Sequence, residues 1–192
     1  TVNVKATNSN PTCEIISPET GVSIPYGETI NFQGLANDVD IDDNFLSVAW
    51  TSDEMEEVIG FSTPTSSGEV LFSFSGLTVD THTITMTVTD EKGAACSDFV
   101  SVVTGTPPTV TIDSPTTATY NEGEIISFSA TVSDNEDQPN DILLEWTTSD
   151  GTVLNSQSAT SDGMVEFVLT DMAYGQQVVT LTGTDTDGLT DS

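Results

Sequence analysis

The sequence predicts an all-β protein made of two similar β-sandwich domains. Three observations lead to this prediction over the 192 residues. Val, Ile, Thr and Phe recur in alternation with polar residues, which is typical of strands with one buried face. The second half of the chain repeats the pattern of the first half. Finally, no amphipathic helical segment is available to cross between parallel strands, so antiparallel sheets are expected.

The repeat fixes the expected domain boundaries. The pair Ser17-Pro18 matches Ser114-Pro115, and Asp38 precedes Trp50 by the same twelve residues that separate Asp134 from Trp146. The offset drifts from 97 to 95 residues, which requires only single-residue changes in loops. We therefore expect an N-terminal strand and linker followed by two domains, with the ranges 1–10, 11–106 and 107–192.

Each copy reads as about seven short strands joined by turns rich in Gly, Asp and Asn. The run Thr83-Ile84-Thr85-Met86-Thr87-Val88 alternates strictly, so one face is core and the other is a threonine surface. A tryptophan on the third strand and the even strand spacing indicate an immunoglobulin-like sandwich. In the first copy we expect strands near 12–16, 28–36, 45–52, 57–61, 69–75, 82–89 and 96–104.

Several short motifs carry a resemblance to a known group of domains. They are the Ser-Pro entry, Gly27-Glu28, the acidic loop at Asp38 to Asn44, Trp50-Thr51-Ser52-Asp53, Gly76-Leu77, His82-Thr83-Ile84-Thr85, and Asp90 followed by Gly93. With these motifs the chain resembles the tandem Ig-like or PKD-like repeats of large secreted and surface proteins of bacteria and archaea. The glycine-rich turn that follows the tryptophan in PKD domains is missing, so the broader Ig-like description fits better. The resemblance implies stalks, adhesins, fibres or accessory modules of enzymes.

The charge balance narrows the possible partners. The chain has 31 Asp and Glu residues against two Lys and no Arg, and its formal net charge is −29. Such a surface repels phosphate backbones and anionic lipids, which argues against nucleic acid and against direct membrane insertion. No window of 18 consecutive apolar residues occurs. Cations are therefore the expected partners.

Two cysteines indicate the redox compartment. Cys13 lies at the first strand of the first copy and Cys96 at the start of its last strand, so in a sandwich both lie near the same pole. A disulfide between them predicts an extracellular or cell-surface protein. The alternative is a pair of buried free thiols. The second copy has Val110 and Asp191 at the matching positions.

Acidic loops suggest a bound cation. In each copy one acidic loop follows the second strand, and another lies in the last hairpin. In a sandwich these loops emerge at the same pole, and converging carboxylate oxygens suit Ca²⁺, whereas a transition metal prefers His or Cys. The alternative is a solvated acidic turn. The candidate calcium ligands are Asp38, Asp40, Asp42, Asp90, Asp134, Glu136, Asp137, Asp185 and Asp187.

The two ends of the chain predict assembly. The segment Val2-Asn3-Val4-Lys5-Ala6 matches the last strand of the first copy, whereas the second copy stops at Ser192, before its own version of that strand. We expect Val2, Val4 and Ala6 to complete the second sandwich of a neighbouring unit. This head-to-tail contact does not close on itself and generates a homopolymeric filament. If the sequence is cut from a longer repeat protein, the same strand is a covalent continuation.

Catalysis is not expected. His82 is the only histidine, there is no arginine, and the carboxylates fall on loops without an identifiable cleft. The chain therefore offers few of the residues that a nucleophilic triad or a phosphate-binding site requires. The predicted function is a structural subunit of an extracellular filament or surface array, rigidified by calcium. The alternatives are a stalk of a calcium-dependent adhesin and an accessory module of a secreted hydrolase.

Overall fold

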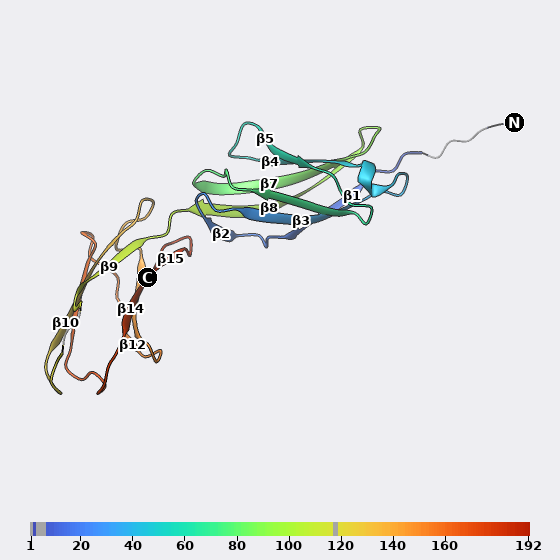
Figure 1. Cartoon of the computed structure of the whole chain (residues 1–192). Coiled ribbons are helices and arrows are strands. Elements are labelled where there is room, and N and C mark those ends of the chain that lie inside the picture. Colours follow the sequence, from blue (N-terminus) through green and yellow to red (C-terminus); the bar gives the residue numbers. More distant parts are fainter. Residues whose placement is uncertain (1, 3–6, 117–118) are drawn as a thin grey trace. The chain divides into compact units, whose positions relative to one another are not determined.

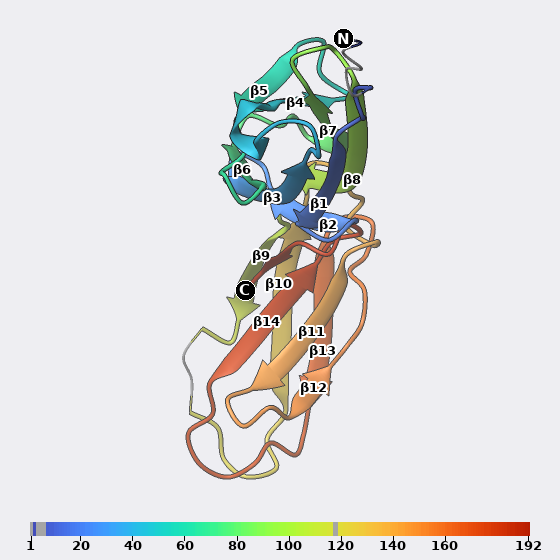
Figure 2. The same ribbon diagram turned by 90° about the vertical axis from the view of Figure 1, so that its right-hand side faces the viewer.

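The computed structural model describes residues 2, 7–116 and 119–192 (Figures 1 and 2). Strands dominate both halves of the chain, and the predicted all-β fold with two immunoglobulin-like sandwiches is confirmed. The chain divides into two compact units, Thr1–Thr104 and Gly105–Ser192. We call them the first and the second sandwich and describe each by itself. In the described part of the chain, no helix is long and apolar enough to cross a membrane.

The first sandwich consists of a three-stranded sheet and a five-stranded sheet, in which β1-β3-β6 and β8-β7-β4-β5 pair antiparallel. The strand orders are β1-β3-β6 and β2-β8-β7-β4-β5. The bounds are β1 Thr12–Ser17, β2 Val22–Pro25, β3 Ile30–Asn37, β4 Ser47–Ser52, β5 Val58–Ser62, β6 Glu69–Phe74, β7 Asp80–Thr89 and β8 Ala95–Gly105. The strand β2 is missing from the sequence-based expectation, because it has only four residues and ends in Pro25, which argues against a strand. A short 3-10 helix, η1 at Asp43–Phe45, ends the acidic loop.

Aromatic rings fill the centre of the first sandwich. Trp50 is fully buried and stacks on Phe72 with ring centroids 5.2 Å apart, while Phe32 lies 5.3 Å from the same indole. The Trp50 indole N–H donates to Ser62 Oγ at 2.9 Å. Gly60 in β5 lies directly over the Phe72 ring, since a Cβ added there would come within 2.3 Å of a ring carbon. Only glycine lets this edge strand cover the aromatic cluster.

The second sandwich repeats the same plan with fewer strands. Its sheets have the orders β13-β10-β9 and β12-β11-β14-β15. The bounds are β9 Thr109–Ser114, β10 Ile126–Ser133, β11 Leu143–Thr148, β12 Val153–Asn155, β13 Met164–Leu169, β14 Val179–Thr184 and β15 Thr190–Asp191. The pairing register matches as well: Phe32 faces Phe72 across β3 and β6, and Phe128 faces Phe167 across β10 and β13.

The core of the second sandwich uses equivalent residues in a different packing. Trp146 is fully buried, and its ring meets Phe128 and Phe167 edge-on at 5.6 and 5.3 Å. Phe128 and Phe167 stack on each other at 4.7 Å. The Trp146 indole N–H is buried and has no hydrogen-bond partner among the residues that the structure describes. The two cores thus differ in one hydrogen bond: the indole N–H of Trp50 has an acceptor, and that of Trp146 has none in the described part of the chain.

Candidate functional sites

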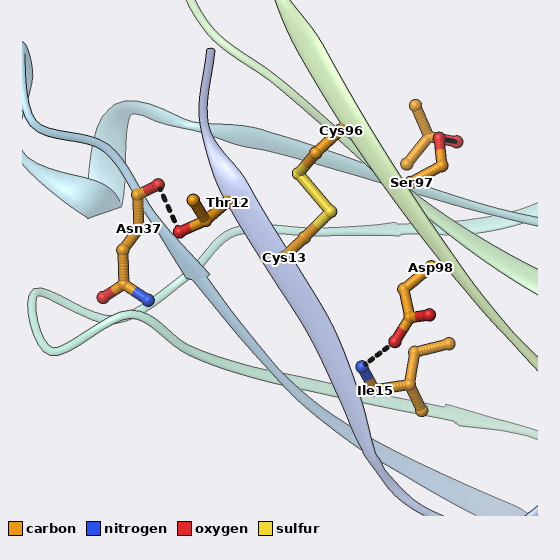
Figure 3. The surroundings of a disulfide bond; sticks show 8 residues. Thr12, Cys13, Ile15, Asn37, Cys96, Ser97 and Asp98 are labelled. Atoms are coloured by element: carbon orange, nitrogen blue, oxygen red, sulfur yellow. Dashed lines mark hydrogen bonds between the residues drawn. A yellow bond between two sulfur atoms is a disulfide. The ribbon is translucent and has the colours of Figure 1, made fainter. Parts of the chain in front are cut away.

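Cys13 and Cys96 form a disulfide that joins the two sheets of the first sandwich (Figure 3). Cys13 lies on β1 and Cys96 on β8, with Cα atoms 6.1 Å apart. Next to the bridge, the Asp98 carboxylate accepts the backbone N–H of Ile15 at 2.7 Å, as Figure 3 also shows. The first and last strands of this sandwich are therefore held by a covalent bond and a charged hydrogen bond.

A hydrogen bond stands in the place of the disulfide in the second sandwich. Val110 occupies the position of Cys13, and Asp191 occupies that of Cys96. The Asp191 carboxylate accepts the Val110 N–H at 3.2 Å. The contact between first and last strands is thus kept, although its chemistry is weaker.

At the acidic pole of the first sandwich, a lysine supplies the positive charge. Asp90 is buried, and its Oδ1 accepts the backbone N–H groups of Lys92 and Ala94 at 2.8 Å each. The Asn8 amide donates to the other oxygen of Asp90 and accepts from Lys92 Nζ at 2.8 Å. The Asn8 hydrogen bond is the main cause that lowers the pKa of Asp90. Asp40, whose Oδ2 accepts the Ser9 N–H at 2.5 Å, adds to the negative field that acts on Lys92.

The equivalent pole of the second sandwich has no such cation. Lys92 is replaced by Asp187 and Asn8 by Gly105, where a Cβ would lie 3.3 Å from an Asp187 carboxylate oxygen. Asp185, the counterpart of Asp90, is buried and accepts the Leu189 N–H at 2.7 Å. Burial raises the pKa of Asp185, and the negative charges of Asp134 and Asp187 raise it further. Three carboxylates therefore share a partly desolvated position.

In both sandwiches, one carboxylate oxygen of the equivalent aspartate has no hydrogen-bond partner among the described residues. Asp38 Oδ1 accepts the Asp40 N–H at 2.7 Å, and Asp134 Oδ1 accepts the Glu136 N–H at 2.7 Å. The second oxygen of each aspartate is buried and lacks a hydrogen-bond partner within the described ranges. In those same ranges, no group of three or more His, Cys, Asp or Glu side chains is arranged to hold a metal ion.

The remaining predicted ligands are engaged in other ways. Asp42 is exposed before η1 and makes no side-chain cap there. Glu136 accepts the backbone N–H of Thr106 at 3.0 Å, and Asp137 accepts that of Thr186 at 2.8 Å. Both carboxylates thus tie loops of the second sandwich together. In the second sandwich, the negative charges of Asp134 and Asp187 act on Asp185. In the first sandwich, the negative charges of Asp40 and Asp90 act on Lys92.

The predicted assembly strand falls largely outside the described residues. Val4 and Ala6 are not described, and Val2 is 91% exposed. The edge that this strand is expected to fill is well defined. In the first sandwich β7 pairs with β8 over all of its ten residues, whereas in the second β14 pairs with β15 only through Gly183 and Thr184. Within the described chain, residues 179–182 of β14 have no partner on that side.

A hollow lies beside this unpaired stretch. It is lined by Val110, Ile112, Val179, Thr180, Leu181 and Ser192. In the first sandwich, Ile84 faces Val100 of β8 and is fully buried. Val179, its counterpart, is only half-buried. The apolar side chains that Val100 and Val102 provide in the first sandwich have no equivalent in the described part of the second.

The single histidine is a core residue. His82 is fully buried, with Nδ1 2.8 Å from Ser52 Oγ and Nε2 2.8 Å from the Thr78 carbonyl oxygen. Both ring nitrogens are therefore satisfied. The contacts around Lys92 were not anticipated from the sequence, although one signal was present: Lys92 is one of two cations in the chain and lies in an acidic hairpin.

Comparisons with known proteins support the fold. No protein-family model matches the chain, and no curated protein sequence matches it. Among solved structures, the fibronectin(III)-like modules of Clostridium thermocellum CbhA match with a TM-score of 0.54 and 17% identity, over 94% of this chain and 90% of that chain. The I67–I69 fragment of titin gives a TM-score of 0.49 at 12% identity, over 92% of this chain and 65% of that one. The CbhA match shows that tandem sandwich modules share this fold.

Proposed function

We propose that this chain is a structural module of an extracellular filament or fibrous cell-surface array, in which a strand from a neighbouring unit completes the second sandwich. The observation that carries the proposal is the contrast between the two sandwiches. Val100 and Val102 fill the core beside β7, whereas Val179 beside the unpaired edge of β14 is half-buried. An unpaired edge with apolar residues recruits an added strand, because backbone hydrogen bonds supply affinity and alternate side chains fill pockets.

The burial pattern of β8 shows at which positions an incoming strand must direct apolar side chains into the core. Val100, Val102 and Thr104 point inward and are buried, while Phe99 is exposed. If Thr1 directly followed Ser192, Asn3 and Lys5 would take the positions of Val100 and Val102. A shift of one residue turns every side chain to the opposite face. A strand that is not joined to Ser192 is free to make that shift, and Val2 and Val4 then point inward.

The proposed donor is therefore the N-terminal segment of a second copy, shifted by one residue from direct continuation. Charged substitutions test this register in the full-length chain. Val4→Glu places a carboxylate in the core and should abolish filaments in electron micrographs. Asn3→Glu makes the same change in charge at an outward position and should leave them intact. Filaments that survive Val4→Glu but fail with Asn3→Glu would favour direct continuation, and filaments indifferent to both would remove the proposal.

The mass of the native polypeptide separates a second copy from a longer chain. A mass near 20.3 kDa supports strand donation between subunits, and a much larger mass supports a continuous repeat protein. A distinct binding domain in that larger chain would favour an adhesin stalk. A catalytic domain beside an isolated pair of sandwiches would favour an accessory module. The Cys13–Cys96 disulfide supports an oxidising, extracellular location for each of these.

We also propose that the acidic pole of the second sandwich binds Ca²⁺. The buried oxygen of Asp134 without a hydrogen-bond partner supports this role. The described residues hold no preformed group of three carboxylates, so Asp185 and Asp187, whose charges already interact, would have to move toward the ion as it binds. The donors are all oxygens, as a hard cation requires. In the first sandwich Lys92 already supplies positive charge at the same pole. We therefore expect one site per chain, in the second sandwich.

Calorimetric titration with CaCl₂ tests this site. We expect saturable binding that Asp134→Asn weakens at least tenfold, because a charged ligand is lost. The matched control Asp38→Asn changes the equivalent residue of the first sandwich, which has Lys92 at its acidic pole, and should leave binding unchanged. Absence of binding heat, or equal loss from both variants, would contradict the site.

A further inference from the structure

On one face of the first sandwich, the strands themselves carry no charged side chain, and a carboxylate appears only just after β4, where Asp53 accepts the Thr83 N–H at 2.6 Å. This is the outward face of β5, β4, β7 and β8, four neighbours in the five-stranded sheet (Figure 1). The inward residues alternate and are buried, among them Trp50, Ile84 and Val100. The residues between them are all Ala, Ser, Thr, Val or Phe: every second residue of β4 from Ser47, of β7 from Thr81, and of β8 from Ala95 to Val103. We call this surface the uncharged face.

The uncharged face is unusual in a chain of net charge −29. The equivalent face of the second sandwich has Glu145 at the centre of β11. The other sheet of the first sandwich has Glu14 and Glu69 on its strands. Two copies that approach through those surfaces bring like charges together, which opposes association. The uncharged face is where two copies meet without that penalty.

Its shape is also suited to a second copy. Phe61 on β5 is 76% exposed and Phe99 on β8 is 69% exposed. The two strands between them carry small residues: Ala49 pairs with Phe61 and with Thr87, and Thr85 pairs with Phe99. Two projecting rings therefore flank a strip of small side chains. In a two-fold pairing the rings of one copy lie over the strip of the other, since such an interface must be self-complementary.

We infer that the uncharged face binds the same face of a second copy, so that first sandwiches associate sideways. The four strands, of 6, 5, 10 and 11 residues, lie about 4.8 Å apart and rise about 3.3 Å per residue, which gives roughly 500 Å² per copy. A stable interface buries about 800 Å² per partner, so an isolated pair is weak. Repeated along an array, weak pairs add and hold neighbouring filaments together. The inference does not depend on strand completion, which uses the other sandwich.

Salt gives the pairing a recognisable signature. Ion-pair interfaces weaken as ionic strength rises, because salt screens attraction. Here the strands of the interface carry no charged side chains, and the negative charges on the rest of the two copies repel each other. Screening therefore strengthens the association, and we expect a Kd of roughly 0.1–1 mM at 0.5 M NaCl, about tenfold weaker at 0.05 M.

Sedimentation equilibrium of the full chain tests the pairing. All samples carry Val4→Glu, so that strand donation does not contribute. We expect a salt-strengthened dimer that Phe61→Glu and Phe99→Glu each weaken at least tenfold. The matched control is Leu71→Glu, which adds the same charge at a residue 61% exposed on the opposite sheet. It should leave the dimer unchanged, and thermal melting should show all variants folded.

Three results would overturn the inference. The first is a chain that stays monomeric at millimolar concentration in high salt. The second is a dimer that Leu71→Glu weakens as much as Phe61→Glu. The third is a monomer whose Thr85 and Thr87 amide signals shift with a neutral oligosaccharide such as cellohexaose, which would assign the face to a glycan.

Discussion

The two sandwiches share strand order and core positions, yet they are closed by different chemistry. In the first, β8 pairs with all of β7 and is joined to β1 by the Cys13–Cys96 disulfide. In the second, Asp191 on β15 makes a hydrogen bond where Cys96 makes a covalent bond. The comparison teaches that the alternating core residues specify the fold, whereas closure and polar contacts vary independently. The second sandwich is the less stable of the two by this reasoning.

Removal of the disulfide should produce the largest effect. It closes a loop of 83 residues, and the double variant Cys13→Ala/Cys96→Ala should lower the free energy of unfolding of the first sandwich by about 4 to 5 kcal/mol. The second sandwich should be unaffected. Hydrogen exchange of β7 and β14 amides measures the two units separately. Equal loss of protection in both would show that they unfold as one unit.

The two core tryptophans should respond differently to the same substitution. Trp50→Phe removes a hydrogen bond and leaves the Ser62 hydroxyl without its donor, whereas the Trp146 N–H has no described partner to lose. We expect Trp50→Phe to cost about 1 to 2 kcal/mol more than Trp146→Phe. Urea unfolding followed by hydrogen exchange in each sandwich measures this difference. Equal costs would mean that the packing differences outweigh the hydrogen bond.

Asp191 should matter moderately for the second sandwich. Asp191→Ala removes the acceptor of the Val110 N–H, and we expect a loss of about 1 kcal/mol from the free energy of unfolding. Thr190→Ala, one residue earlier on the same strand, serves as the control. The shift in the urea midpoint of the second sandwich measures the effect. If both variants behave alike, the hydrogen bond contributes nothing specific.

The equivalent aspartates Asp90 and Asp185 should give pH effects of opposite sign. Burial raises the pKa of Asp185, so the folded state binds the proton more tightly than the unfolded state, whose pKa is near 3.8. The second sandwich therefore loses stability as pH rises through these values. The Asn8 hydrogen bond lowers the pKa of Asp90, so its stabilisation is present above pH 3.8 and is lost as pH falls through the folded value.

Asparagine variants isolate these two contributions. At neutral pH, Asp185→Asn should raise the stability of the second sandwich, while Asp90→Asn should lower that of the first. The differences from the parent chain should shrink for both as pH falls, for Asp185 already above pH 3.8 and for Asp90 only below it. Urea midpoints at pH 3 and pH 7 measure them. Effects of the same sign at neutral pH would show that the two poles are electrostatically alike.

Much of the fold was predictable because it depends on local pattern. The alternation from Thr83 to Val88 predicted β7, and the repeated spacing from Asp38 to Trp50 predicted both cores. Strand β2 was missed because it has only four residues and ends in Pro25, which argues against a strand. The inward direction of Val100 and Val102 was also missed, since one residue of shift reverses a strand and spacing alone does not determine it.

The sequence by itself determined the tandem sandwiches, the central tryptophans and the acidic poles, because periodicity and repeats follow from the order of residues along the chain. Only the tertiary structure decided which oxygens accept which N–H groups, that Lys92 lies at one pole and Asp187 at the other, and that the strands of one sheet face carry no charged side chain there. These features depend on which distant strands become neighbours. Side chains far apart in sequence meet across such pairs, and no local pattern records their distance.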